Sequence, residues 1–376
     1  MLLVLTYVML FLVVHAVFRA EYNGKSLPDP DGRMERDVVT LLLLGFFAFR
    51  GLPVLNDTNH YYQAQYDLIF RNRDWLHSST WFYVDDSSIW EPLFQIVQSI
   101  IAHLWANPYA LIMISAIVLT LATVWYVRRN TSQVALTIFF LMSFCFLPEH
   151  YAAMRQGWAI SLCYAGLWLQ SRRHIKSAVL CVVLAMGFHA SAVVILVAQA
   201  LTLLRFTVRN LIIFAIVGIA VIAMLSPLLE IMEMAENIYV QESAARNMNL
   251  AAFLNLFFYL SLAAISWWLG RRYNIPAPSR IVLWSCTLCI LFSFSSIFVT
   301  VAYRFTCYFS IFFILLLLHY LEAAPHRMRN AVLTLLVILG VAKLGIELQY
   351  RNEWKHLVPY SFYDFRQGIQ NEVFEY

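Results

Sequence analysis

Residues 108–127, PYALIMISAIVLTLATVWYV, carry no charged side chain and are followed at once by Arg128 and Arg129. An α-helix rises about 1.5 Å per residue, so this stretch reaches about 30 Å, the thickness of the hydrocarbon core of a bilayer. A pair of arginines directly after such a stretch is typical of the cytoplasmic end of a membrane span. The stretch therefore predicts a transmembrane helix.

The composition of the whole chain supports the same conclusion. Its 376 residues are 61% hydrophobic and 13% charged, whereas soluble domains are about 45–50% apolar and about 25% charged. A soluble core of this size could not hide so much apolar surface, so lipid must surround most of the chain. We expect an all-α polytopic membrane protein with a single transmembrane domain over residues 1–376. The net charge of +4 is modest, and no nucleic-acid partner is expected.

Apolar runs bounded by charged residues predict about twelve spans. Their approximate limits are 1–18, 38–50, 108–127, 133–148, 157–171, 177–188, 190–204, 210–226, 251–269, 281–301, 304–321 and 330–348. The first run lacks a basic start and a small-residue cleavage site, so we expect it to be a retained span. One long helix over 176–206 would place one of its two basic ends outside. The sequence therefore favours two short helices that break near Gly187-Phe188-His189.

The distribution of basic residues predicts the orientation of the chain. Alternate connections hold 16 of the 26 lysines and arginines and are expected to be cytoplasmic. These residues are Arg19, Lys25, Arg33, Arg36, Arg128, Arg129, Arg172, Arg173, Lys176, Arg205, Arg209, Arg271, Arg272, Arg280, Arg327 and Arg329. The opposite connections are acidic and are expected to face the periplasm. They are the loops 50–107 and 227–250 and the tail 349–376.

Residues 91–106 are apolar enough to resemble a short span. A crossing here would place Arg128 and Arg129 on the outer side, against the charge rule. We therefore expect an interfacial or re-entrant amphipathic helix in this part of the outward-facing loop, with Trp90 and Trp105 at the level of the lipid headgroups.

When residues are counted along the expected spans, four basic side chains fall near the outer face of the membrane. Arg50 lies about 21 Å and His189 about 20–24 Å from their cytoplasmic anchors, within the outer leaflet. Arg155 lies about 26 Å and Arg304 about 35 Å from theirs, near the outer interface. A charge in lipid costs at least about 2.5–3.5 kcal/mol and normally faces a cavity or a partner. We expect the four side chains to form one polar site.

Each of these residues also has a structural explanation. Arg50 and Arg304 could extend to lipid phosphates as ordinary interface residues. Arg155 could pair with Glu149, and a single histidine on an apolar helix is more often structural than functional. His189, however, lies at an expected chain reversal, in GFHASA, where small neighbours leave room for a ligand.

Arginines at the outer face are suited to a lipid-linked diphosphate. Arg makes bidentate, charge-assisted bonds to phosphate oxygens and keeps its proton. A diphosphate is a weakly basic leaving group, so its departure from a sugar needs charge stabilisation more than a general acid. An attacking sugar hydroxyl needs a base, for which His189, Asp57, Glu91 and Glu149 are candidates. No Asp-x-Asp motif or close histidine pair occurs on the outer side, so we expect no metal or other cofactor.

Five short motifs occur in order between about residues 45 and 310. They are Phe49-Arg50 with Asn56-Asp57-Thr58 and Tyr61; Glu91-Pro92-Leu93-Phe94; Met154-Arg155-Gln156-Gly157-Trp158-Ala159; Phe188-His189-Ala190-Ser191-Ala192; and Arg304 with Tyr308 and Phe309. In residue type, order and spacing they resemble the motifs of the EpsG/Wzy-type polysaccharide polymerases, the O-antigen and exopolysaccharide polymerases. Each motif alone is a weak signal, and their order makes the resemblance specific.

The resemblance implies a glycosyltransferase C-like fold and a metal-independent enzyme of the bacterial inner membrane. Such an enzyme joins undecaprenyl-diphosphate-linked oligosaccharide repeat units by en bloc glycosyl transfer at the periplasmic face. Its expected partners are the lipid-linked oligosaccharide, membrane lipid, and the chain-length regulator and flippase of the same pathway.

The resemblance also implies roles for single residues. The residues expected to take part in catalysis are His189, Arg304, Arg155, Asp57 and Glu91. The residues expected to bind the diphosphate or other parts of the substrate are Arg50, Arg155, Arg304, Tyr61, Gln156, Tyr308 and Glu149. In this assignment His189 is the base, while Asp57 and Glu91 hold sugar hydroxyls or serve as the alternative base.

Two other classes of function stay open. A flippase or transporter of lipid-linked oligosaccharides places polar residues near the midplane and often has repeated halves, whereas here the span interiors are almost uncharged and no repeat is visible. An O-antigen ligase or a membrane acyltransferase would work at the same outer face. Loss of a polymerase leaves single repeat units attached, loss of a ligase leaves polymer unattached, and loss of an acyltransferase leaves chain length intact.

Overall fold

The computed structural model describes residues 33–55, 57–71, 91–231, 250–299, 302–350, 357 and 360–364. These residues confirm the all-α class: they form helices and contain no β-strand, only an isolated antiparallel bridge between Arg50 and Phe362. They fold into two compact units. Residues within 1–168, 176–192 and 335–376 make up the first unit, and residues 169–175 and 193–334 make up the second.

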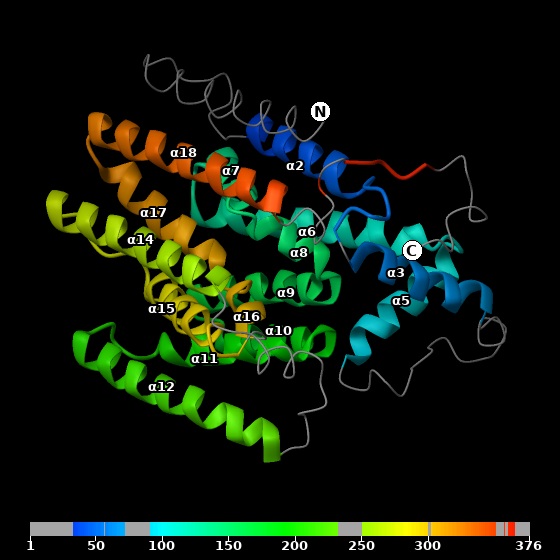
Figure 1. Cartoon of the computed structure of the whole chain (residues 1–376), viewed down its shortest axis with the longest axis horizontal. Coiled ribbons are helices and arrows are strands. Elements are labelled where there is room, and N and C mark those ends of the chain that lie inside the picture. Colours follow the sequence, from blue (N-terminus) through cyan, green and yellow to red (C-terminus); the bar gives the residue numbers. More distant parts are fainter. Residues whose placement is uncertain are drawn as a thin grey trace. The chain divides into compact units, whose positions relative to one another are not determined.

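The first unit is organised around one long helix, α6. Helices α2, α3, α5, α7 and α8 all pack against α6, which lies beside α2 and α7 in Figure 1. Leu111 and Ile112 of α6 are fully buried among these helices, whereas Leu121 is 51% exposed. The helices that lie wholly or mostly in this unit are α2 (Arg33–Phe47), α3 (Asp57–Tyr66), α5 (Pro92–Leu104), α6 (Tyr109–Asn130), α7 (Val134–Ser143), α8 (Phe146–Ala152), α9 (Met154–Ser171), α10 (Ile175–Phe188) and α18 (His326–Tyr350).

The second unit is organised around α15, which contacts α11, α12, α14, α16 and α17. Trp284 of α15 is fully buried and meets the rings of Phe206 and Phe214 edge-on, with centroids 5.1 and 5.6 Å away. The helices of this unit are α11 (Val193–Leu201), α12 (Val208–Ile231), α14 (Leu250–Tyr273), α15 (Arg280–Ser295), α16 (Tyr303–Thr306) and α17 (Ser310–Ala323).

The described helices are those of a multi-pass membrane protein. Three of them are long and apolar enough to cross a bilayer: Tyr109–Asn130, Ala251–Tyr273 and His326–Gln349. The bent pair α7–α8 raises this number to four if it forms one span, and several shorter apolar helices accompany them. The span expected at 108–127 coincides with α6. The total of about twelve spans, their orientation and the glycosyltransferase C-like fold stay predictions.

The expected break near 187–189 is confirmed. Helix α10 ends at Phe188, and a 3₁₀ turn over Ala190–Ala192 precedes α11. A second break was not expected: α7 stops at Ser143, and α8 starts at Phe146 in a direction bent by 73°. The region expected to be a span over 133–148 therefore contains a bend that the sequence did not predict. Cys145, at φ 60°, adopts the left-handed conformation that ends one helix and redirects the chain into the next.

Parts of the expected loops can be compared with the structure. Residues 57–71 and 92–104 of the loop 50–107 are helical, and α5 is too short, at about 20 Å, to cross the hydrocarbon core. The expected span 1–18, residues 72–90, residues 232–249 of the loop 227–250, and most of the tail 349–376 lie outside the described residues.

Gly157 allows α9 to lie close to α6 and α8, which predicts an effect of substitution. A Cβ at this position would lie 2.6 Å from the carbonyl oxygen of His150 and 2.5 Å from Leu119 Cδ2. The carbonyl oxygen can move only if α8 moves. We therefore expect Gly157→Ala to destabilise the protein by about 1–3 kcal/mol, measured as a lower thermal unfolding midpoint in detergent micelles.

Gly45 of α2 provides the matched control, because a Cβ there meets nothing within 4 Å. Gly45→Ala should be neutral or stabilise the helix by about 0.5–1 kcal/mol. The same loss of stability in both variants would contradict the close approach at Gly157.

Candidate active site

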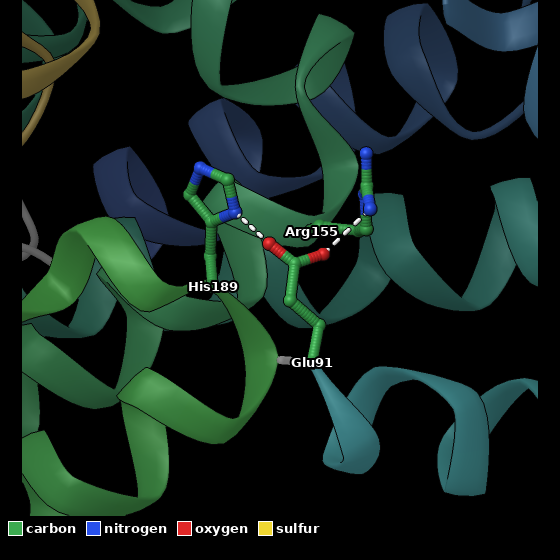
Figure 2. Close-up of polar contacts among 3 residues, drawn as sticks. All are labelled: Glu91, Arg155 and His189. Atoms are coloured by element: carbon green, nitrogen blue, oxygen red, sulfur yellow. Dashed lines mark hydrogen bonds and ion pairs between the residues drawn. The ribbon is translucent and has the colours of Figure 1, made fainter. Parts of the chain in front are cut away.

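Three helix ends of the first unit bring Glu91, Arg155 and His189 together, as Figure 2 shows. Glu91 immediately precedes α5, Arg155 lies in the first turn of α9, and His189 follows the last residue of α10. Pro92 begins α5, where its fixed φ suits the first helical turn and its missing N–H is not needed. Segments about 100 residues apart in the sequence therefore meet at one carboxylate.

The Glu91 carboxylate interacts with a different partner through each oxygen. Arg155 Nη1 donates to Oε2 at 2.6 Å, and His189 Nδ1 is hydrogen-bonded to Oε1. An ionised carboxylate only accepts hydrogen bonds, so the imidazole carries its proton on Nδ1. In the neutral ring, Nε2 is then the acceptor. This arrangement presents a basic nitrogen in a fixed direction.

Exposure differs among the three side chains. The side chain of Arg155 is 40% exposed, against 11% for Glu91 and 17% for His189. Burial on its own raises the pKa of Glu91, but the hydrogen bonds and charges of His189 and Arg155 outweigh it, so the pKa lies below the usual 4.5. Glu91 is therefore ionised at neutral pH, and Arg155 is the member of the cluster that a ligand reaches most easily.

Tyr61 of α3 extends the cluster. Its hydroxyl lies close enough to Arg155 to feel the charge of the guanidinium, and its ring meets Phe94 of α5 edge-on at 5.8 Å between centroids. Burial raises the pKa of Tyr61, and the nearby Arg155 offsets this only in part. The phenol therefore stays protonated. Asp57, at the exposed start of α3, interacts with Tyr61 through its charge.

Close packing fixes the positions of Glu91 and His189 relative to each other. A Cβ on Gly187, at the end of α10, would lie 2.7 Å from Leu93 Cγ, so the two helix ends touch. Phe188 stacks on Trp158 of α9, with centroids 5.4 Å apart and planes 4° from parallel. Trp158 Nε1 donates to Ser115 Oγ of α6 at 3.0 Å. The cluster is therefore anchored to the central helix of the unit.

Arg50 is enclosed by the first unit. Its side chain is only 1% exposed, and its guanidinium donates to Phe47 O, Thr58 Oγ1 and Tyr151 O at 2.7, 2.9 and 3.3 Å. These acceptors belong to the ends of α2 and α8 and to α3. The expected contact of Arg50 with the diphosphate stays a prediction. Counting depth along a helix could not reveal this enclosure, because it does not give the direction of the side chain.

The tail makes a contribution that the sequence analysis missed. Gly51 N donates to Ser361 O at 2.8 Å and Tyr363 N to Phe49 O at 3.0 Å, so residues 360–364 pair with the backbone after α2. Tyr363 also stacks on Tyr109 of α6, with centroids 3.9 Å apart. The aromatic run YSFYDF at 360–365 was the available signal.

The remaining expected site residues fall in two places. In the first unit, Gln156 is buried beside Arg155, and Glu149 of α8 is partly exposed. In the second unit, Arg304 lies in α16 and is partly exposed, and Tyr308 is buried just before α17. The convergence of Arg304 and Tyr308 with the Glu91 cluster stays a prediction. Within the described parts of the chain, no group of three or more His, Cys, Asp or Glu side chains is arranged to hold a metal ion.

The ion pairs of Glu91 predict a pH-dependent contribution to stability. Folding lowers the pKa of Glu91 below 4.5, so its charge stabilises the folded protein above that pH. This contribution is lost as the pH falls through the lower, folded-state value. Glu91→Gln should therefore reduce the thermal midpoint at about pH 7, with the difference from wild type shrinking below about pH 4. The measurement is the thermal unfolding midpoint of the Glu91→Gln and wild-type proteins in detergent across this pH range.

The exposed pair Arg36–Asp37 serves as the control, because surface ion pairs contribute about 0–1 kcal/mol. Asp37→Asn should change the midpoint little at either end of the pH range. A Glu91→Gln difference that stays constant from neutral to acidic pH would show that the ion pairs are not its source.

The comparison with known families covers nearly all of the described structure. Residues 37–362 match the EpsG family, from α2 to the tail residues that pair beside Arg50. The matched region includes both compact units and every site residue expected from the sequence. No curated protein and no solved structure matches the chain. The chain belongs to the EpsG family, which is a family of Wzy-type polysaccharide polymerases.

Proposed function

We propose that this protein joins undecaprenyl-diphosphate-linked oligosaccharide repeat units by en bloc glycosyl transfer at the periplasmic face of the bacterial inner membrane. The family supports the polymerase class. The observation that carries the mechanism is the Glu91 carboxylate, which holds a histidine on one oxygen and an arginine on the other. A base and a phosphate-binding group are thereby fixed side by side.

His189 is the proposed base. Because Glu91 holds Nδ1–H, Nε2 is left as the nitrogen that accepts the proton of the acceptor sugar hydroxyl. The hydroxyl oxygen then bonds to the anomeric carbon of the donor glycan, and the bond from that carbon to the diphosphate breaks. The electron pair leaves with undecaprenyl diphosphate. Glu91 acts as the orienting group, because both its oxygens are already occupied by His189 and Arg155.

Arg155 is the proposed ligand of the diphosphate. A guanidinium has five N–H donors, and the bond to Glu91 uses only part of them. The partly exposed remainder can bond phosphate oxygens and stabilise the charge that develops as the diphosphate leaves. The neutral Tyr61 hydroxyl adds a donor for phosphate or sugar oxygens.

The other expected residues complete the proposal. Arg304 and Tyr308 supply a second contact to the diphosphate, and Asp57 and Glu149 hold sugar hydroxyls. The charge arrangement requires no metal ion, since arginines take the place of a cation beside the leaving group. A flippase delivers the repeat units and a chain-length regulator limits the product.

Substitution of the proposed base and phosphate ligand tests the function. His189→Ala removes a general base, which typically contributes about 10²–10⁴-fold in rate, and Arg155→Ala removes charge stabilisation of the leaving group. We expect both variants to leave single repeat units in place of long polymer. The measurement is the length distribution of surface glycan in cells that lack the wild-type gene, with expression of each variant checked.

The exposed residues His174 and Arg172 give matched controls of the same residue types. His174→Ala and Arg172→Ala should support polymer of normal length. Long polymer in the His189→Ala and Arg155→Ala cells, at normal expression, would refute the assignment. Purified protein that flips lipid-linked oligosaccharide in proteoliposomes without elongating it would indicate a transporter instead.

A further inference from the structure

Lys343 places a charge within the apolar helix α18. This helix is one of the three that are long and apolar enough to cross a bilayer. Lys343 lies about 14 residues, or about 21 Å, beyond Arg329 near the start of that helix. A lysine at such depth costs about 2.5–3.5 kcal/mol on insertion scales, so a partner that offsets the cost is expected. The motifs and the proposed mechanism give Lys343 no role.

A partner of Lys343 lies at the break between α7 and α8. Its Nζ donates to the carbonyl oxygen of Phe144 at 2.8 Å and lies 5.7 Å from the ring centroid of Phe146. Phe144 ends α7, and Phe146 begins α8 after the left-handed Cys145. The ammonium therefore contacts both sides of the 73° bend.

The end of a helix inside a membrane creates a need for such a group. The last carbonyl groups of a helix have no partner within the helix and carry partial negative charge. No water is present in the hydrocarbon region to satisfy them. All ten residues of α7 are buried, so its end is enclosed by protein. A cation that donates to Phe144 O satisfies this carbonyl and also complements the helix dipole.

Gly340 brings the lysine close enough for this contact. It lies one turn before Lys343 on the same face of α18, and a Cβ there would lie 2.9 Å from Ser143 Cβ and 3.3 Å from the Phe144 ring. A larger residue would push α18 away from the end of α7. The close approach and the charge therefore occur together on one face of the helix.

The direction of α8 affects the position of Arg155. Tyr151 of α8 stacks on Phe47, with centroids 3.7 Å apart, and its carbonyl accepts a hydrogen bond from Arg50. The chain then enters α9, whose first turn carries Arg155. A change in the bend would move the start of α9 relative to Glu91.

We propose that Lys343 is a positioning residue whose ammonium caps α7 and fixes the α7–α8 bend that presents Arg155 to Glu91 and to the donor diphosphate. The part that concerns the diphosphate rests on the proposed function, whereas the cap and the bend do not. The role requires a cation that reaches Phe144 O, so arginine should replace lysine and a neutral side chain of equal length should not.

Steady-state kinetics of the reconstituted protein with an undecaprenyl-diphosphate-linked donor test the positioning role. Lys343→Met should raise the KM for the donor by about tenfold or more, because small misplacements of a binding group have effects of this size. Lys343→Arg should stay within about threefold of wild type. Lys176→Met, which removes an exposed lysine near the start of α10, is the matched control and should behave as wild type.

Amide hydrogen exchange tests the cap without reference to catalysis. Lys343→Met should accelerate exchange in residues 144–152, while Lys343→Arg and Lys176→Met should not. Unchanged exchange and an unchanged KM in Lys343→Met would overturn the proposal. Accelerated exchange in a protein that does not polymerise even as wild type would retain the cap and reject the proposed function.

If the Lys343→Met protein does not accumulate in cells, two glycine variants of α18 test the proposed cap instead. Gly340→Ala should separate α18 from the end of α7 and accelerate exchange over 144–152. Gly345→Ala should not, because a Cβ at Gly345 meets nothing within 4 Å. Identical exchange in these two variants would overturn the proposed cap.

Discussion

The first unit depends on the interaction of one carboxylate with two basic side chains. Glu91 is largely enclosed, and a partly buried charge is tolerated only when its partners remain in place. Its partners come from α9 and the end of α10, so the ion pairs hold three separate helix ends at one point. The close packing of Gly187 against Leu93 holds two of those ends together independently of the charges. Packing sets the distance, and the carboxylate sets the orientation of the histidine and the arginine.

In the proposed mechanism this shared carboxylate also links the two substrates. Arg155 serves Glu91 and, when the donor is present, the diphosphate. A bound diphosphate competes for the guanidinium and leaves more of the Glu91 charge to His189. The acceptor hydroxyl would then be activated when the donor occupies the site, which limits loss of the donor to water.

Helices and their breaks, which follow from the pattern of apolar and charged residues, can be predicted from the sequence. The direction of a single side chain is much harder to predict. Basic residues at both ends of 176–206 were sufficient to predict the break at His189, and the uncharged run 108–127 predicted α6. The enclosure of Arg50 was not predictable, because helical position gives depth and not direction. The α7–α8 break had one usable signal. Pro148 lies in the first turn of α8, where a proline is tolerated, although it would disrupt the middle of a longer helix.

Arg50 and Lys343 show how structural and functional cations differ in this protein. Lys343 binds the carbonyl at the end of α7, and Arg50 binds the carbonyl of Tyr151 near the end of α8. A buried arginine and a partly buried lysine therefore bond backbone carbonyls at the ends of the two halves of a bent helix. Arg155 instead pairs with a carboxylate and keeps 40% of its side chain exposed. The acceptor and the exposure of the cation therefore distinguish a group that holds the backbone from one that can bind a ligand.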